Sequence, residues 1–321
     1  MSERARAMQH SITRRGAGLQ VTEWHNPHFG FCYTAARRLY GGRSLFQSID
    51  MLRTQEFGRV LLLDNVTQVA ERKDWMYHEP MVHPAMCCHP RPADVLVIGG
   101  GDGGALREVL KYRAVRRVVF AELDAEVVAL SRRYLKTVNA GAFDDPRVEM
   151  VISDGRQYVE RNPRRFDVVI MDMTDPFGPS RMLYTREFFG AVKRSFKDRR
   201  GVFVMHGESP VVRPHAYASV QKTLASVFRH VGTLYLYVQM YAMLWSIAVS
   251  SDTVNIARRP GPSIDARLRA NGIRRLKVYS GATHHAMQVA FPYVEDLLRR
   301  TGRVVTDREP DFADNIHSSR R

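Results

Sequence analysis

The chain has 321 residues, of which 45% are hydrophobic and 25% are charged, a composition that suits one or two folded domains. No apolar run approaches the ~18 residues of a membrane-spanning helix, and the first residues lack the apolar stretch of a signal peptide, so we expect a cytoplasmic protein without a membrane partner. The formal net charge is +15, but the arginines occur as scattered pairs and not as one stripe with interleaved aromatic residues, so a nucleic-acid partner is not expected.

The first part of the chain predicts an N-terminal β domain. We expect residues 1–19 to form a disordered arm and residues 20–71 to form a small antiparallel sheet, because SLFQSIDMLRT and GRVLLLDNVTQVA have strand-like apolar content with glycine-containing breaks between them. The three cysteines, Cys32, Cys87 and Cys88, lack metal-ligand spacing, so we expect reduced, structural thiols and no metal site.

Helices and strands are predicted to alternate through a second domain, residues 72–303, which begins with a helix over 72–88. The predicted strands are 94–98, 117–122, 147–152, 166–172, 201–206, 231–238 and 244–250, and the predicted helices between them are 104–112, 125–138, 155–161, 186–197 and 214–229. This order predicts an α/β fold with a doubly wound parallel sheet whose last two strands form an antiparallel hairpin. Residues 304–321 are expected to form a flexible tail.

The glycine loop in VLVIGGGDGGALREVLK follows the first strand of this sheet and precedes a helix, which predicts a nucleoside site that includes Gly99 and Gly101. Its unusual residue is Asp102. A carboxylate in this loop would repel the pyrophosphate of a dinucleotide, so we expect a nucleoside that carries a positive charge. S-adenosylmethionine and its decarboxylated form, both sulfonium nucleosides, meet that description.

Acidic residues follow most of the predicted strands, although the chain as a whole is basic. Because ligands of doubly wound sheets bind outside the carboxyl ends of the strands, these side chains should converge on one crevice. A crevice with this charge predicts cationic ligands. The residues are Asp102, Glu122, Asp124, Asp154, Asp172, Asp175 and Glu208.

Three of these carboxylates have distinct interpretations. Glu122 lies about 20 residues beyond the glycine loop, where an acidic residue accepts hydrogen bonds from ribose hydroxyls. Asp154, followed by Gly155, lies where an adenine amino group could bind, although Asp-Gly is also a common turn. Asp124 is interpreted as the N-cap of the helix that follows it.

Asp172 and Asp175, in VVIMDMTDPFGP, are the candidates for chemistry. An amine that attacks the carbon beside a sulfonium must first lose a proton, which it holds with a pKa near ~10. A carboxylate at a strand end can accept that proton, and such general-base help accelerates a reaction by ~10²–10⁴ fold. A second carboxylate three residues on suits a diamine, which has two charges to bind.

The chain resembles the polyamine aminopropyltransferases, the spermidine synthase family, over residues 20–300. The motifs that carry the resemblance are LLLDNVTQVAERKDWMYHEPMVH, VLVIGGGDGGALREVLK, AELD, SDG and DVVIMDMTDPFGPSRMLYTREFF. The resemblance implies an N-terminal β domain followed by a Rossmann-like catalytic domain of the class I methyltransferase type, in a homodimer or homotetramer. It also implies transfer of an aminopropyl group from decarboxylated S-adenosylmethionine, a co-substrate, to a polyamine acceptor, with no tightly bound cofactor.

Roles for individual residues follow from the resemblance. It implies that Asp172 is the catalytic acid-base residue, and that Tyr77 and Asp175 act beside it. The donor-binding positions that it implies are Gln47, Asp102, Glu122, Asp154 and Asp172. The acceptor-binding positions that it implies are Trp24, Gln68, Tyr77, His78, Asp175, Glu208 and Tyr241.

The sequence departs from the family in the acceptor half. In QMYAMLWSIAVSSD the family's Tyr-Pro-Ser-Gly stretch keeps only Tyr241, and HGESPVVRP brings Arg213 near a region expected to bind a cation. Putrescine is the expected acceptor, but a longer amine of the thermospermine or spermine pathway, agmatine or a changed donor stays open. Two other hypotheses also stay open: a polyamine N-methyltransferase on the same scaffold, and a non-catalytic protein that binds nucleosides or nucleic acid.

Overall fold

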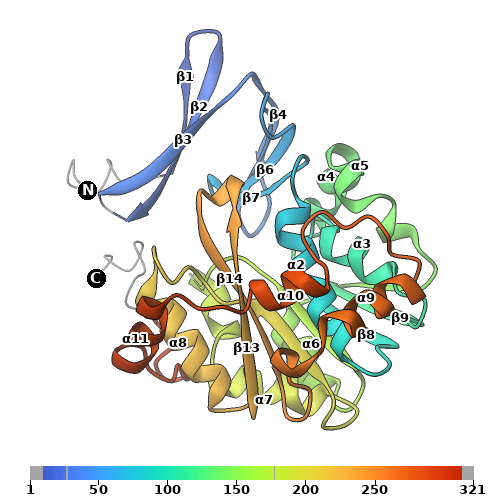
Figure 1. The fold of residues 1–321 in the computed structure, drawn as a ribbon. Helices are drawn as coiled ribbons and strands as arrows, with labels where there is room; N and C mark the ends of the chain where they lie inside the picture. The colour runs from blue at the N-terminus through green and yellow to red at the C-terminus, as the bar shows by residue number, and fades with distance from the viewer. Residues whose placement is uncertain (1–9, 27, 177, 313–321) are drawn as a thin grey trace.

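The computed structural model describes residues 10–26, 28–176 and 178–312. Two small antiparallel sheets project from one end of a larger α/β body (Figure 1). The first contains β1 (Ser11–Arg15), β2 (Gly18–Asn26) and β3 (Phe29–Ala35). The second contains β4 (Arg37–Arg43), β5 (Ser48–Arg53), β6 (Arg59–Leu63) and β7 (Val66–Ala70).

Two predictions for this region are wrong. The β region is two sheets and not one, and residues 11–19, predicted to be part of a disordered arm, are ordered. Strand β1 pairs along its whole length with β2, from Ser11 opposite Thr22 to Arg15 opposite Gly18, so main-chain hydrogen bonds order a segment with few apolar side chains. The rest of the predicted arm, residues 1–9, lies outside the described residues.

The α/β body is built on a seven-stranded sheet with the order β10-β9-β8-β11-β12-β14-β13. The first five of these strands are parallel, and β14 pairs antiparallel with both β12 and β13, which confirms the predicted doubly wound sheet and its final hairpin. The strands are β8 (Asp94–Gly99), β9 (Arg117–Glu122), β10 (Val148–Ile152), β11 (Val168–Asp172), β12 (Val202–His206), β13 (His230–Val238) and β14 (Met243–Ser251). The order of the strands reverses between β8 and β11, which is where such sheets bind their ligands.

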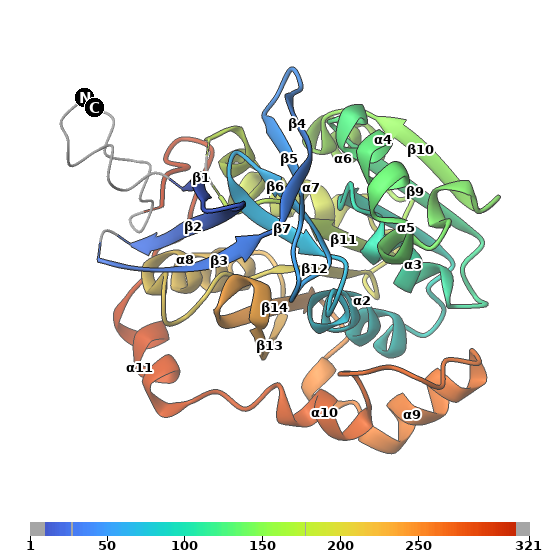
Figure 2. The same ribbon diagram turned by 90° about the horizontal axis from the view of Figure 1, so that it is seen from above.

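Helices cover both faces of this sheet (Figure 2). Those within the alternating region are α2 (Trp75–Cys88), α3 (Gly104–Leu110), α4 (Ala125–Tyr134), α5 (Lys136–Asn139), α6 (Gly155–Arg161), α7 (Arg186–Ser195) and α8 (Pro214–Ala225). The helix predicted over 125–138 is divided into α4 and α5, because Leu135 between them is not helical. Short 3-10 turns occur at Ala142–Asp144, Gly178–Leu183, Gln239–Tyr241 and Ile256–Arg258.

The C-terminal part of the chain wraps around the body (Figure 2). It contains three helices that the sequence did not predict: α9 (Gly261–Ala270), α10 (Gly281–Ala286) and α11 (Pro292–Arg300). The predicted flexible tail is wrong over residues 304–312. Asp307 pairs with Arg156 of α6 at 2.5 Å and accepts a hydrogen bond from Thr185 at 2.6 Å, and Phe312 is buried. Specific ionic and apolar contacts therefore order a segment whose composition is polar.

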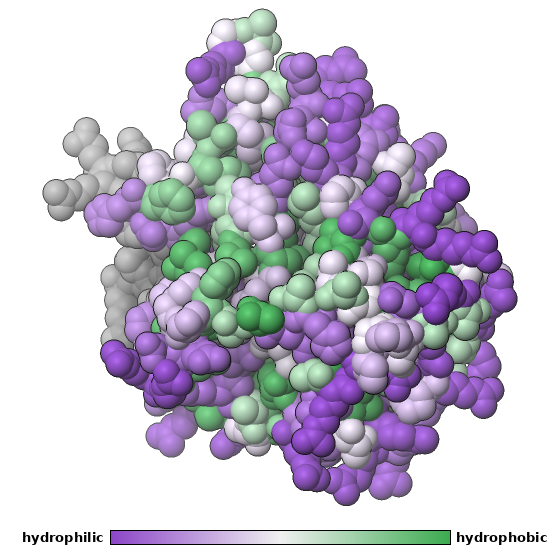
Figure 3. Space-filling model, viewed as in Figure 1, coloured by the Kyte–Doolittle hydropathy of each residue, from purple (hydrophilic) through white to green (hydrophobic). Residues whose placement is uncertain are grey.

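One hydrophobic core extends from the small sheets into the body, because Val21, Leu52 and Leu62 belong to the same buried cluster as Val97 and Val204. On the face shown in Figure 3, apolar side chains gather across the middle of the molecule, and hydrophilic side chains dominate its rim. None of the helices in the described part of the chain combines the length and apolarity that a membrane crossing needs.

Candidate active site

The glycine loop after β8 and the end of β11 face each other where the strand order reverses. Gly99 and Gly100 have φ values of 72° and 69°, which other residues adopt only with strain. A Cβ at Gly99 would lie 2.4 Å from the carbonyl oxygen of Asp172, and a Cβ at Gly100 would lie 2.8 Å from its Oδ2. The glycines therefore let the loop approach the carboxylate of Asp172.

Asp172 is the central carboxylate of the site. Its Oδ1 accepts a hydrogen bond of 2.9 Å from the hydroxyl of Tyr77, while its Oδ2 is buried and has no hydrogen-bond partner among the described residues. Burial and the nearby charge of Asp102 raise the pKa of Asp172 to about 6, although His78 and the Tyr77 hydroxyl oppose the shift. A carboxylate with this pKa and an uncommitted oxygen can take up a proton near neutral pH.

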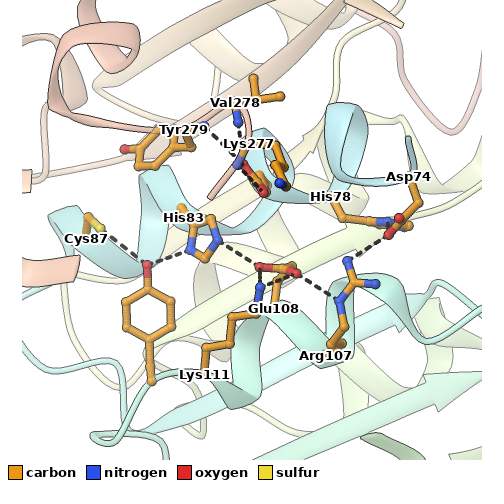
Figure 4. Close-up of polar contacts among 12 residues, drawn as sticks. Asp74, His78, His83, Cys87, Arg107, Glu108, Lys111, Lys277, Val278 and Tyr279 are labelled. Atoms are coloured by element: carbon orange, nitrogen blue, oxygen red, sulfur yellow. Dashed lines mark hydrogen bonds and ion pairs between the residues drawn. The ribbon is translucent and has the colours of Figure 1, made fainter. Parts of the chain in front are cut away.

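A chain of alternating charges lies behind Asp102. Nε2 of His78 is 3.3 Å from Oδ1 of Asp102. On its other side, Nδ1 of His78 is 3.2 Å from Oδ2 of Asp74, and Arg107 approaches the same Asp74 oxygen at 2.7 Å (Figure 4). Burial alone would lower the pKa of His78, but the carboxylates of Asp102 and Asp74 outweigh it and raise the pKa to about 10. His78 is therefore a cation beside the glycine loop, where a Cβ at Gly104 would meet its ring, and its place with Gln68 in the acceptor channel stays a prediction.

Glu122 and Gln47 meet around Asp124. Glu122 lies beside the loop, because a Cβ at Gly101 would be 3.1 Å from its Oε2, and burial raises its pKa to about 7. Asp124 accepts a hydrogen bond from the Glu126 amide at the start of α4, which confirms that it is a helix cap. It also accepts a hydrogen bond of 3.0 Å from the Gln47 amide, which brings the β4–β5 connection to this edge of the site.

Asp154 is exposed and caps α6, where its Oδ1 accepts a hydrogen bond of 2.9 Å from the Gln157 amide. A Cβ at Gly155 would lie 2.3 Å from a methyl group of Ile98, so this glycine lets α6 approach β8. The structure thus gives both residues a local role, and their binding of adenine stays a prediction.

Aromatic side chains line the other side of Asp172. The rings of Tyr77 and Tyr241 meet edge to face with centroids 6.0 Å apart, and Trp245 lies 5.3 Å from Tyr241. The Tyr241 hydroxyl donates a hydrogen bond of 2.9 Å to the carbonyl of Gln68, which joins β7 to the connection before β14. The side-chain amide of Gln68 donates a hydrogen bond to the carbonyl of Val66, so the Gln68 side chain is directed along β7.

Asp175 and Glu208 form a second acidic group, and Arg213 binds both. Nη1 of Arg213 lies 2.6 Å from Oδ2 of Asp175 and 3.4 Å from Oε2 of Glu208. Burial would lower the pKa of Arg213, but the two carboxylates outweigh it and raise the pKa, so the guanidinium is charged. The sequence placed Arg213 near a region expected to bind a cation but did not predict its ion pairs with Asp175 and Glu208.

Sequence reasoning missed two residues of β2 that face this group. Glu23 is 6% exposed and accepts hydrogen bonds from the amide and hydroxyl of Thr67, and burial raises its pKa to about 7. Burial and the charge of Arg213 lower the pKa of His25 to about 4. The signal was present in GLQVTEWHN, because alternation places Glu23 and His25 on one face of the strand with the buried Val21. Trp24 points to the opposite face, where its ring lies against Gly30, so the structure does not bring it to the predicted acceptor wall.

Two trios of side chains have ligand atoms within 4.8 Å of one another: His78, Asp102 and Asp172, and Asp175, His206 and Glu208. In the first trio the His78 imidazole lies between the carboxylates of Asp102 and Asp74, and the carboxylates of the second trio bind Arg213. These contacts account for both trios as charge networks, and the absence of a metal site stays a prediction.

The doubly wound sheet, its glycine loop and its carboxylate-lined crevice define a class of protein: enzymes that bind a nucleoside and act on a cationic small molecule. Comparison with known proteins identifies the family. Residues 74–259 match the family profile described as the spermine/spermidine synthase domain, and residues 20–71 match the one described as the spermidine synthase tetramerisation domain. The chain belongs to the spermine/spermidine synthase family, and it is an aminopropyltransferase.

Two relatives from different organisms are both named polyamine aminopropyltransferases. The polyamine aminopropyltransferase of Nitrosomonas europaea is 39% identical over 282 residues, which cover 88% of this chain and 86% of that protein. Polyamine aminopropyltransferase 1 of Hyperthermus butylicus is 39% identical over 80% of this chain and 89% of its own length.

Solved structures agree with this assignment. A spermidine synthase in complex with the transition-state analogue AdoDATO has a TM-score of 0.83 and 32% identity, covering 92% of this chain and 99% of that one. The spermidine synthase of Thermotoga maritima has a TM-score of 0.80 and 31% identity over 92% of this chain and 98% of its own.

Proposed function

We propose that this enzyme transfers the aminopropyl group of decarboxylated S-adenosylmethionine to putrescine, which forms spermidine and releases methylthioadenosine. The amine nitrogen of the acceptor attacks the aminopropyl carbon bonded to sulfur. The carbon–sulfur bond breaks, its electron pair neutralises the sulfonium, and the nitrogen loses one proton. The donor binds as a co-substrate that is consumed in each turnover.

Asp172 is the proposed general base, and its uncommitted Oδ2 is the observation that carries the proposal. The Tyr77 hydroxyl bonds the other oxygen and orients the carboxylate, so one oxygen is left to accept the proton of the attacking amine. The pKa of Asp172, raised to about 6, makes it a stronger base than an ordinary aspartate, and the aromatic side chains of Tyr77 and Tyr241 exclude water beside it.

The donor is proposed to bind along the glycine loop. Asp102 would bind its terminal ammonium, and Glu122 would accept hydrogen bonds from the ribose hydroxyls. Gln47 and Asp154 would complete this subsite. Asp102 also gives a reason for a decarboxylated donor, because the carboxylate of intact S-adenosylmethionine would be repelled there. Nε2 of His78 lies 3.3 Å from Oδ1 of Asp102 and would help to hold this carboxylate in place.

The acceptor is proposed to extend from Asp172 toward Asp175 and Glu208. Asp172 and Tyr77 would receive its attacking amine, and the second acidic group would bind its distant ammonium. Glu23 and His25, which face Arg213 and Asp175, extend this subsite to the N-terminal sheet. We also propose that the chain forms a homotetramer through residues 20–71, which match the tetramerisation domain.

A product assay by mass spectrometry tests the proposal. Purified enzyme is given decarboxylated or intact S-adenosylmethionine, each with putrescine, cadaverine, agmatine, spermidine or spermine. Spermidine together with methylthioadenosine, formed from the decarboxylated donor and putrescine, is the expected result. A methylated amine with adenosylhomocysteine would instead establish a methyltransferase, and preferential transfer to another amine would replace putrescine as the acceptor.

A further inference from the structure

Arg213 is a buried cation inside the subsite that is proposed to bind the distant end of the acceptor. It is 6% exposed and ends the connection between β12 and α8. Its backbone is held on both sides, because its amide donates to the Ser209 carbonyl and its carbonyl accepts from the Tyr217 amide. Pro214 follows as the first residue of α8. The guanidinium is therefore a fixed part of the subsite.

Glu208, one of its two partners, is held at a conformational cost. Its φ is 68°, in the left-handed region that residues other than glycine rarely adopt. The hydroxyl of Ser246 donates a hydrogen bond of 2.6 Å to its carbonyl, and its side chain is fully buried. The fold thus maintains a residue with a strained backbone, whose buried carboxylate lies 3.4 Å from Nη1 of Arg213.

Arg213 offsets part of the negative charge of this subsite. Among the described residues, Asp175 and Glu208 contribute two carboxylates, and the guanidinium of Arg213 binds both. The neighbouring imidazoles, His25 and His206, have lowered pKa values because they are buried, so they add no positive charge at pH 7. Burial raises the pKa of Glu23 to about 7, so the charge of that carboxylate depends on what binds beside it. Arg213 is therefore the fixed positive charge among these groups, and it cancels one of the negative charges that an acceptor would meet.

We propose that Arg213 makes the enzyme select diamines over triamines, because it cancels one of the negative charges that the part of the acceptor beyond the attacking nitrogen would meet. A diamine brings one ammonium there and a triamine brings two, so the second would bind close to a buried guanidinium. This inference rests on the proposed function and names the residue that sets its acceptor class.

A pair of acceptors of equal length separates charge from size in the wild-type enzyme. Spermidine and 1,8-diaminooctane have the same number of atoms between their terminal nitrogens, but spermidine carries one more positive charge. We expect kcat/KM for 1,8-diaminooctane to exceed that for spermidine by about tenfold, which corresponds to ~1.4 kcal/mol. Equal values, or a preference for spermidine, would overturn the inference without affecting aminopropyl transfer to putrescine.

Three variants then test the residue. Arg213→Met removes the positive charge and should shift the ratio of the two kcat/KM values toward spermidine by about tenfold or more. Arg213→Lys keeps the charge and should keep the wild-type ratio. The double variant Arg213→Met/Glu208→Gln removes one charge of each sign, so its ratio should return to the wild-type value.

The outcomes distinguish the two proposals. A ratio that does not change in Arg213→Met, or one that stays shifted in the double variant, would overturn the role of Arg213. Absence of any aminopropylated product in the wild-type enzyme would instead overturn the proposed function. If Arg213→Met does not fold, which circular dichroism would show, the wild-type comparison of the two acceptors still decides the inference.

Discussion

At the scale of single residues, the site depends on carboxylates whose pKa values the fold has raised toward neutrality. Burial is the largest cause for Asp172, Glu122 and Glu23. Each lies near at least one other carboxylate, and a cationic donor and acceptor would supply the opposite charge that the free enzyme lacks. Binding of the substrates should therefore lower these pKa values.

Asp172→Asn separates chemistry from binding. The amide cannot accept the proton of the attacking amine, so kcat should fall by ~10² or more, while the dissociation constant of the decarboxylated donor should change by a few fold. Rapid-quench kinetics and calorimetry would measure the two quantities. The exposed, ion-paired Asp311→Asn is the control, and it should behave as wild type. An Asp172→Asn enzyme with normal kcat would remove this residue from the mechanism.

The dependence of kcat/KM on pH below 7, the acid limb of the pH profile, should report the ionisation of Asp172, Glu122 and Glu23. Because Asp172 must be ionised to act as a base, and the pKa values of Glu122 and Glu23 are raised to about 7, kcat/KM should fall as the pH decreases from 7 through 6, with a slope steeper than one proton. Glu23→Gln should make the limb shallower and leave its lower part, near pH 6, in place. A profile that stays flat down to pH 5 would contradict the raised pKa values.

At the scale of elements, α2 connects the site to the C-terminal part of the chain. Its first turns carry Tyr77 and His78, and the next residue, Glu79, accepts hydrogen bonds from the main-chain amides of residues 277–279 (Figure 4). Further along, His83 bonds the buried Glu108 of α3 at 2.9 Å. Nearly all residues of α2 are buried, and the helix makes polar contacts both with α3 and with the C-terminal part of the chain.

Glu79→Ala should destabilise the protein by about 3 kcal/mol, because hydrogen bonds to a charged group contribute ~1.5–3 kcal/mol and the amides of residues 277–279 would lose their acceptor. Urea unfolding would measure the change, and hydrogen exchange should locate faster exchange at residues 277–279. Glu295→Gln, on the exposed face of α11, is the control and should have little effect. Unchanged exchange at residues 277–279 would show that Glu79 does not hold this segment.

The sequence predicted the regular elements better than the contacts between them. Alternation of apolar runs and helical segments, with glycine after the first strand, was sufficient for the sheet from β8 to β14 and for the place of Asp172. It was not sufficient for the Arg213 ion pairs or for the cation at His78, because those depend on residues far apart in the chain. Helix α10 has six residues and α9 a weak apolar pattern, so neither produced a periodic signal.

At the scale of the whole molecule, the small sheets are part of the site and not an appendage. Gln47 bonds Asp124, Tyr241 bonds the main chain of β7, and Glu23 and His25 face the acidic group of the body. Any assembly that fixes the sheets would therefore also fix one wall of the acceptor subsite.

The tetramer predicts a measurable mass. Light scattering coupled to gel filtration should give four times the 36.7 kDa of the chain at micromolar concentration, because residues 20–71 match a tetramerisation domain. The same measurement on dilute samples, combined with activity assays, would show whether dissociation and loss of activity coincide. A mass of one chain at all concentrations would contradict the assembly.

The contact of Asp307 with Arg156 and Thr185 has a consequence for synthesis of the protein in the cell. Arg156 belongs to the helix that Asp154 caps, beside the proposed adenine subsite. A ribosome makes the chain from its N-terminus, so this helix emerges long before its partner at residue 307. The proposed adenine subsite can gain this contact only after residue 307 has left the ribosome, and chains halted before that residue should bind the donor less well than chains that extend beyond it.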